Sequence, residues 1–245
     1  MLIHGVLNLN KPPKMTSRQA VDRVKRLFNI RKAGHAGTLD PDATGVLLIC
    51  LGNATKLFEP LQLGTKAYEG TLTLGITTDT LDASGQILKT EDTSGITPDQ
   101  IRGVSQQFIG EIEQIAPMFS AAKHKGKRLY KLARQGLQVE RLPRNVTIES
   151  LEILSINMPE VRCRVVCSKG TYIRTLAADI GAALGCGAHL SQLTRTRSGP
   201  FRIEDSHAFE SLENQPLSPD YAVTPIETVV ETLNRQLMSK ISAKE

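Results

Sequence analysis

Two aspartates, Asp40 and Asp42, flank a proline in the stretch GHAGTLDPDATGVLLIC, residues 34–50, directly before a run of aliphatic side chains. A carboxylate in such a position can act as a nucleophile or as a base. No Gly-Lys-Ser/Thr follows the glycines of this stretch and no GxGxxG occurs, so a nucleotide cofactor has no support in the sequence. The glycines alone predict tight turning and close backbone approach, and they leave His35 and Asp40 unexplained.

Basic side chains gather in three zones that contain no acidic residue, although the formal net charge is only +5. The first zone lies between Glu113 and Glu140, the second runs from Arg162 to Ala178, and the third is LTRTRSGPF near residue 195. A run of this kind can be a solvated helix face. The absence of counter-charges favours instead a groove that follows a phosphate backbone. The basic residues of the first zone are Lys123, Lys125, Lys127, Arg128, Lys131 and Arg134.

The composition is that of a globular chain, which at 245 residues can form one large domain, or one domain with a small appendage. The N-terminus lacks the pattern of a signal peptide, and no apolar run approaches the ~18 residues that span a bilayer. The four cysteines form no CxxC pair, so buried free thiols are expected rather than structural zinc. A cytoplasmic protein is expected.

Strands and helices alternate along the chain without a strict βαβ order, which predicts an α+β fold with a mixed, largely antiparallel sheet. A strand is expected in GVLNLN, and a helix is expected to be capped by Thr16 or Ser17. The acidic, proline-containing residues 208–224 are interpreted as a linker before a final helix that begins at Pro225. The other expected elements are a buried strand or helix at 45–51, antiparallel strands near 68–85, a helix from Thr97, strands at 146–156 and 161–168, and a helix at 172–184 closed by Gly185.

The stretch GHAGTLDPDATGVL closely resembles the catalytic motif of the tRNA pseudouridine-55 synthases, the bacterial TruB family. Four more blocks resemble that family in order, and the resemblance extends over roughly residues 3–202. It implies a pseudouridine-synthase fold, α+β with a mixed, mostly antiparallel sheet flanked by helices and a central RNA-binding cleft. It also implies isomerisation of one T-loop uridine of tRNA, position 55, by base flipping without cofactor or metal. The four blocks are LNLNKP, AYEGTLTLGITTDTLDASG, KGKRLYKLARQG and CSKGTYIRTLAADIGAALGCGAHL.

The resemblance assigns three catalytic residues. Asp40 matches the family's catalytic aspartate, acting at C1′ of the ribose or removing a proton from C2′, whereas Asp42 falls at a variable position. Arg174 matches the arginine that opposes the rise of an aspartate's pKa on burial, typically by ~1–3 units; the alternative is a phosphate-binding or surface arginine. Tyr68 matches the tyrosine that stacks on the base and accepts the C5 proton; the alternative is a tyrosine in the sheet core.

The resemblance also assigns residues that bind the RNA. Lys11 belongs to the Lys-Pro element that supports the catalytic loop, and the stretch Lys123–Arg134 matches a segment that closes over the RNA arm. The substrate-binding residues are His35, Tyr68, Tyr172, Leu193 and Lys11. The residues expected at the RNA backbone are Lys123, Lys125, Lys127, Arg128, Lys131, Arg195 and Arg197.

The expected organisation is a catalytic domain over residues 1–207, with a thumb-like insertion at about 120–140. Residues 208–245 would be a linker and a helix, so the family's C-terminal RNA-binding domain is expected to be absent or truncated. The expected partner is the T-arm of tRNA, with no membrane and no obligatory protein partner. A tRNA-folding chaperone that needs no catalysis is the alternative function. The RNA-guided archaeal and eukaryotic relatives are a third, which the thumb sequence KGKRLYKLARQG disfavours.

Overall fold

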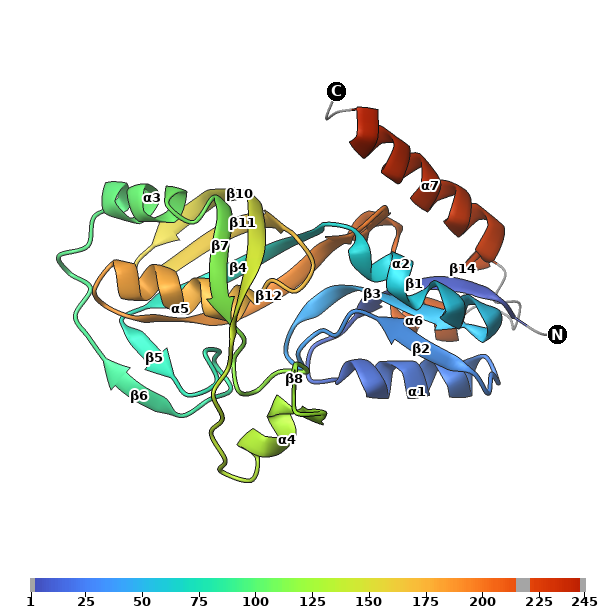
Figure 1. Ribbon diagram of the computed structural model, residues 1–245, viewed down its shortest axis with the longest axis horizontal. Helices are drawn as coiled ribbons and strands as arrows, with labels where there is room; N and C mark the ends of the chain where they lie inside the picture. The colour runs from blue at the N-terminus through green and yellow to red at the C-terminus, as the bar shows by residue number, and fades with distance from the viewer. Residues whose placement is uncertain (1–2, 215–220, 243–245) are drawn as a thin grey trace. The chain divides into compact units, whose positions relative to one another are not determined.

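A computed structural model describes residues 3–214 and 221–242, which divide into two compact units. Unit 1 is drawn from residues 1–67 and 194–245, and unit 2 is residues 68–193. Two strands, β4 (Lys66–Leu74) and β12 (Ala188–Ser198), continue from one unit into the other (Figure 1). Unit 1 is therefore discontinuous in sequence, whereas unit 2 is a single stretch of chain.

Unit 1 contains strands in the order β14-β1-β3-β12, with β2 paired to β3 and β13 paired to β12. The β3–β12 pair is parallel, and the pairs of β1 with β3 and β14 are antiparallel. The strands are β1 (Gly5–Lys11), β2 (Ala33–Ala36), β3 (Thr44–Leu51), β13 (Phe201–Arg202) and β14 (Val223–Pro225). The helices are α1 (Ser17–Leu27), α2 (Phe58–Leu63), α6 (Phe209–Glu213) and α7 (Ile226–Ser242), with 3-10 turns η1 (Gly52–Leu57) and η2 (Ile203–Asp205).

Both faces of β1 and β3 are buried, as the continuous apolar run of β3 predicts. One face packs Val6, Val46 and Leu48 against Leu61 of α2 and Val229 of α7. Because side chains alternate along a strand, the neighbouring residues of β1 and β3 point to the other face. Figure 1 draws α1 on the opposite side of these strands from α7.

Helix α1 begins at the predicted place. The Thr16 side chain accepts a hydrogen bond from Gln19 N, and the Gln19 side chain accepts one from Thr16 N. This capping box satisfies two backbone groups that a helix start leaves without a partner. Helix α3 begins at an identical arrangement of Thr97 and Gln100 with Pro98 in its first turn, which confirms the second predicted helix start.

Unit 2 contains strands in the order β12-β4-β11-β10-β7, and the pairs of β10 with β11 and β7 are antiparallel. Two small hairpins, β5–β6 and β8–β9, stand apart from this sheet. The strands are β5 (Ile76–Thr78), β6 (Ile87–Thr90), β7 (Gly110–Ile115), β8 (Lys123–His124), β9 (Lys127–Arg128), β10 (Pro143–Asn157) and β11 (Glu160–Cys167). The helices are α3 (Pro98–Gln106), α4 (Leu129–Ala133) and α5 (Ile173–Ala183). The predicted α+β class with a mixed, mostly antiparallel sheet is confirmed.

Strand β11 confirms the expected position of two cysteines. Cys163 and Cys167 are free and buried, on the same face as Val161 and Val165. The intervening arginines point to solvent, where Arg162 and Arg164 both bind the carboxylate of Glu69 at 2.6 and 2.9 Å. The strand is thus half-buried, with its apolar residues on one side.

The interpretation of residues 208–224 as a linker is wrong for most of its described residues. Residues Phe209–Glu213 form helix α6, and β14 pairs with Gly5–Leu7 of β1. The Phe209 side chain is 1% exposed and lies under the Arg23 guanidinium, 4.1 Å from its ring centroid. A five-residue helix and a three-residue strand are too short to produce a periodic pattern, so sequence alone gave no signal for them. Residues 215–220 lie outside the described part of the chain.

We expect Phe209→Ala to destabilise the protein by about 3–5 kcal/mol, because it removes a fully buried ring and leaves a cavity. Thermal or denaturant unfolding of the variant and the parent measures the change. Glu210→Ala, at an exposed position of the same helix, is the matched control and should change stability by less than about 0.5 kcal/mol. Equal stability of Phe209→Ala and the parent would mean that α6 is not part of the core.

Candidate active site

The candidate catalytic carboxylate, Asp40, lies in the loop between β2 and β3, residues 37–43, which we call the Asp40 loop. The carbonyl of Asp40 accepts a hydrogen bond from Ala43 N at 3.2 Å, so Pro41 and Asp42 occupy the centre of a four-residue turn. Proline is favoured at this second turn position because its φ is already fixed. Asp40 is half-buried and Asp42 is exposed, as the sequence analysis expects of a solvated second aspartate.

Lys11 binds the backbone of the Asp40 loop at Pro41. Its side chain is fully buried, and Nζ donates to the carbonyl oxygens of Pro12, Met15 and Pro41 at 2.8, 2.7 and 2.9 Å. An ammonium group has three donors, and all three are used. The contact with Pro41 O agrees with the expected support of the loop, whereas direct binding of substrate by Lys11 stays a prediction.

Arg195 holds the other end of the loop. Its side chain is 2% exposed, and Nε donates to Val46 O at 2.7 Å while the guanidinium also reaches the carbonyls of Gly37 and Thr38 at 3.2 and 3.5 Å. In this structure the Arg195 guanidinium is buried and bonded to three backbone carbonyl oxygens, and its contact with the RNA backbone stays a prediction. Gly45 is required beside it, since at φ +94° a Cβ would collide with the Arg195 carbonyl oxygen.

Ser17 fixes the centre of the loop, a role that the sequence analysis missed. Its buried hydroxyl donates to Leu39 O at 3.0 Å and accepts from Leu39 N at 2.9 Å. A serine at a helix start is expected to be a cap, and here Thr16 takes that role, so the pattern gave no sign of this contact. The residues before and after Asp40 are thus both held by buried side chains.

The electrostatics around Lys11 reflect its burial. Burial lowers the pKa of Lys11 to about 8, although the carboxylates of Asp42 and Asp40 oppose this change. The nearby Arg195 guanidinium lowers the pKa further. At neutral pH Lys11 is therefore still an ammonium ion, and the Asp40 loop lies in a positive environment created by two buried cations.

Arg174 lies in the first turn of α5 in unit 2, and its side chain is 4% exposed. The guanidinium donates to the carbonyls of Thr80 and Phe119 at 3.0 and 2.8 Å, and lies 3.4 Å from the Asp82 carboxylate. The alternative reading of Arg174 as a surface arginine is therefore wrong. These contacts fix the guanidinium in place within unit 2.

Asp82 is a second residue that the sequence analysis missed. Its Oδ1 accepts hydrogen bonds from the hydroxyls of Thr80 and Ser84 and from Ser84 N, at 2.6, 2.6 and 3.0 Å. The turn TDTLDASG is thus folded around one carboxylate, whose Oδ2 faces Arg174. Asp82 lies in a block that resembles the family, and this could have marked it as a candidate. Asp and Ser are common in turns for local reasons, however, so the sequence did not single Asp82 out as a partner of Arg174.

The backbone of Tyr172 is fixed just before α5. Gln114 of β7 is buried; its Nε2 donates to Tyr172 O at 3.2 Å and its Oε1 accepts from Tyr172 N at 3.0 Å. The Tyr172 side chain packs against a small apolar cluster of Ala116, Leu129 and Leu132. Tyr68, on β4, is 9% exposed, so most of its ring is covered.

The predicted thumb consists of the hairpin β8–β9 followed by α4, and we call residues 120–140 the thumb segment. The hairpin turns at Lys125 and Gly126, both with positive φ, the geometry of a two-residue type I′ turn. Leu129 and Leu132 anchor α4, while the basic residues point outward. Those exposed basic residues are Lys123, Lys125, Lys127, Arg128 and Lys131.

The remaining predicted residues are partly exposed. His35 lies on β2 in unit 1, and Arg197 lies on the unit 1 part of β12. Leu193 lies on the unit 2 part of the same strand. No helix of the described residues could cross a membrane. Within the same residues, no group of three or more His, Cys, Asp or Glu side chains could hold a metal ion.

Two family models match adjacent parts of the chain. The TruB family pseudouridylate synthase (N terminal domain) matches residues 25–173, and the tRNA pseudouridylate synthase B C-terminal domain matches residues 174–231. The second match covers α5, β12, α6 and β14, and most of its residues therefore belong to elements already described. Whether the family's further RNA-binding domain is missing stays a prediction.

Curated proteins named tRNA pseudouridine synthase B are similar over most of the chain. The protein of Francisella philomiragia is 50% identical over 86% of this chain and 70% of its own length. That of Syntrophotalea carbinolica is 48% identical over 86% of this chain and 69% of its own, and that of Aromatoleum aromaticum is 48% identical over 96% and 76%.

Two solved structures share the fold. A Cbf5-Nop10-Gar1 complex contains a chain 34% identical, with a TM-score of 0.72, over 94% of this chain and 62% of that one. An H/ACA RNP bound to a substrate RNA containing 2′-deoxyuridine gives 32% identity and a TM-score of 0.69, over 94% and 61%.

We expect Lys11→Met to destabilise the protein by roughly 2–5 kcal/mol at pH 7, because the carbonyls of Pro12 and Met15 lose their buried donor.

The pH dependence of stability gives a second prediction. The pKa of Lys11 in the folded protein, about 8, lies below its ordinary value of 10.5. The unfolded chain therefore binds more protons between these values, and the free energy of unfolding rises with pH. Relative to Lys11→Met, the parent should gain roughly 2 kcal/mol between pH 7 and pH 10. Denaturant unfolding across this range measures both effects, with the exposed Lys14→Met as control; a constant difference would contradict the second.

Proposed function

The chain belongs to the TruB family of pseudouridylate synthases, and we propose that it isomerises one uridine in the T-loop of tRNA, position 55, to pseudouridine. The family models and relatives named tRNA pseudouridine synthase B support the reaction and the RNA class. The observation that carries the assignment of Asp40 is its loop, in which four hydrogen bonds from three buried side chains hold the backbone around one half-buried aspartate.

The proposed reaction is an isomerisation that uses one carboxylate and transfers no group to or from the RNA. The N1–C1′ bond of uridine breaks, the base rotates, and C5 bonds to C1′. In this proposal, ionised Asp40 attacks C1′ to form a covalent intermediate, or it removes the C2′ proton on a route through a glycal. A base on the enzyme then takes the proton from C5, and Tyr68 is the residue we assign to it. No atom is oxidised, and the product has the composition of the substrate.

Arg174 is proposed as the guanidinium that stabilises the ionised form of Asp40. Its burial and its two carbonyl contacts support this role, because a fixed guanidinium stabilises a carboxylate without a cost of reorganisation. Lys11 and Arg195 contribute differently in this proposal. They bind backbone carbonyl oxygens of the Asp40 loop and so hold its main chain in place.

The target uridine must leave its stack, at a cost of a few kcal/mol. Stacking on an aromatic side chain returns ~1–3 kcal/mol per base. We assign the stacking on the target base to Tyr68, and assign His35, Tyr172 and Leu193 to the pocket and the neighbouring nucleotides. The exposed cations of the thumb segment and Arg197 are proposed to bind phosphates of the T-arm. No obligatory protein partner is proposed.

A tRNA-folding chaperone is the second candidate, and Asp40 discriminates between the two. A protein that only binds RNA gains nothing from a carboxylate held near a polyanion, since like charges repel. The fixed Asp40 loop therefore favours the enzyme.

Asp40→Asn should reduce the single-turnover rate on an unmodified T-arm stem-loop by on the order of 10³-fold or more, because an amide can act neither as nucleophile nor as base. Binding should persist, since the amide keeps the size of the side chain and removes a negative charge. Chemical mapping of pseudouridine and filter binding measure the two quantities. The comparison requires first that the parent protein converts uridine in the stem-loop to pseudouridine without added cofactor.

Asp42→Asn is the matched control, because Asp42 is exposed in the same turn. It should convert uridine at nearly the parent rate. Conversion by Asp40→Asn at a comparable rate would disprove the assignment of Asp40. A parent that binds the stem-loop and never modifies it would favour the chaperone.

Changing Lys125, Lys127 and Arg128 together to alanine should weaken binding of the stem-loop and flatten its salt dependence. The log–log slope should fall by about 0.9 or less for each phosphate that the variant no longer neutralises. Thermal unfolding should be unchanged, because all three side chains are exposed. If the slope equals that of the parent, the segment is only a solvated face.

A further inference from the structure

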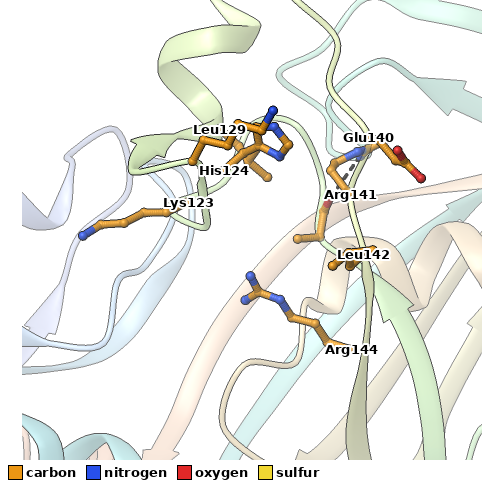
Figure 2. Close-up of a pocket in the computed structure, with 9 residues that line it drawn as sticks. Lys123, His124, Leu129, Glu140, Arg141, Leu142 and Arg144 are labelled. Carbon is orange, nitrogen blue, oxygen red and sulfur yellow. Dashed lines mark hydrogen bonds between the residues drawn. The ribbon is translucent and has the colours of Figure 1, made fainter.

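A pocket of about 400 Å³ lies in unit 2, where the thumb segment meets the start of β10 (Figure 2). Its walls come from β8, the hairpin turn, the start of α4, and the chain that leads into β10. The lining residues are Ala116, Lys123, His124, Lys125, Leu129, Glu140, Arg141, Leu142 and Arg144. We call it the Arg144 pocket.

The charge of this pocket is mainly positive. Four basic side chains line it, against the single carboxylate of Glu140: Lys123, Lys125, Arg141 and Arg144. In Figure 2 the Glu140 carboxylate points away from Arg144. Cations that surround a concave surface focus the potential and raise the local concentration of anions.

Three of these cations lack internal partners, whereas three arginines elsewhere in unit 2 are paired with carboxylates. Within residues 3–214 and 221–242, the side chains of Lys123, Lys125 and Arg144 form no hydrogen bond or ion pair. Arg102, Arg162 and Arg164 each lie against a carboxylate, at 3.4, 2.6 and 2.9 Å. Three unpaired cations therefore lie at the pocket, where an anion can neutralise them.

The two arginines of the pocket differ in their contacts. Arg141 is held in place, since its Nη1 donates to Ala116 O at 2.9 Å. Arg144 is exposed on β10, directly opposite Gln114 of β7. In Figure 2 its guanidinium points from β10 toward the segment that carries Lys123 and His124. A hydrogen-bonded and an unpaired guanidinium therefore border the same space.

We propose that the Arg144 pocket binds one backbone phosphate of the RNA substrate, with Arg144 as its principal donor. The ligand is a phosphodiester because the charge excess suits an oxyanion, while Ala116, Leu129 and Leu142 provide apolar walls for the flanking riboses. This inference rests on the proposed function. It adds Arg141 and Arg144, which the sequence analysis missed because both follow Glu140, outside the acid-free zone.

The test uses Arg144→Ala, with filter binding of the T-arm stem-loop at several salt concentrations. The log–log slope should fall by about 0.7–0.9, and affinity at 0.1 M salt should fall about tenfold. Arg144→Lys keeps the charge and should retain the parent slope. Arg102→Ala, an exposed arginine of the same unit outside the pocket, is the control and should leave slope and affinity unchanged.

Equal slopes for Arg144→Ala, Arg102→Ala and the parent would overturn the proposal, while uridine conversion by the parent would still support the proposed function. If Arg144→Ala shows the expected fall in slope but the parent converts no uridine, the proposed function is overturned and the assignment of the pocket to RNA is supported. A third measurement is titration with inorganic phosphate. Saturable binding that Arg144→Ala abolishes, with no change in RNA slope, would assign the pocket to free phosphate and overturn its assignment to RNA.

Discussion

Two buried cations that bind backbone carbonyls determine the geometry of the Asp40 loop. Lys11 binds Pro41 O and Arg195 binds Gly37 O and Thr38 O, so the residues on both sides of Asp40 are fixed through main-chain atoms. Burying a cation is costly unless its donors are satisfied, and carbonyl oxygens satisfy them here. The conformation of the Asp40 loop is therefore fixed by side chains that bind its main-chain carbonyls.

Unit 2 follows the same principle with a different cation. Arg174 binds the carbonyls of Thr80 and Phe119, which come from a turn and from the chain that leads into the thumb segment. Gln114 holds the backbone of Tyr172 two residues before it. Each unit therefore fixes its own polar groups by internal contacts. Groups held in this way need less reorganisation when charge develops in a reaction.

Local patterns predicted much of this structure, and long-range contacts explain the rest. The cap at Thr16 and the alternation in β11 follow from a few neighbouring residues, and both were predictable. The burial of Arg195 was not, because an arginine is usually exposed and carbonyl partners have no sequence signature. Helix α6 was missed for a related reason, since its packing depends on Arg23, far away in the sequence.

The division of the chain between the two units has a consequence for biosynthesis. Unit 2 is one continuous segment of chain. In unit 1, by contrast, the Asp40 loop and β1 are synthesised long before their partners Arg195 and β14. Domains generally fold as they leave the ribosome, in order of completion. Unit 2 can therefore fold during translation, while the strands and loop made earliest remain without their partners. Until then β1 presents an unpaired edge, the kind of surface that chaperones protect in nascent chains.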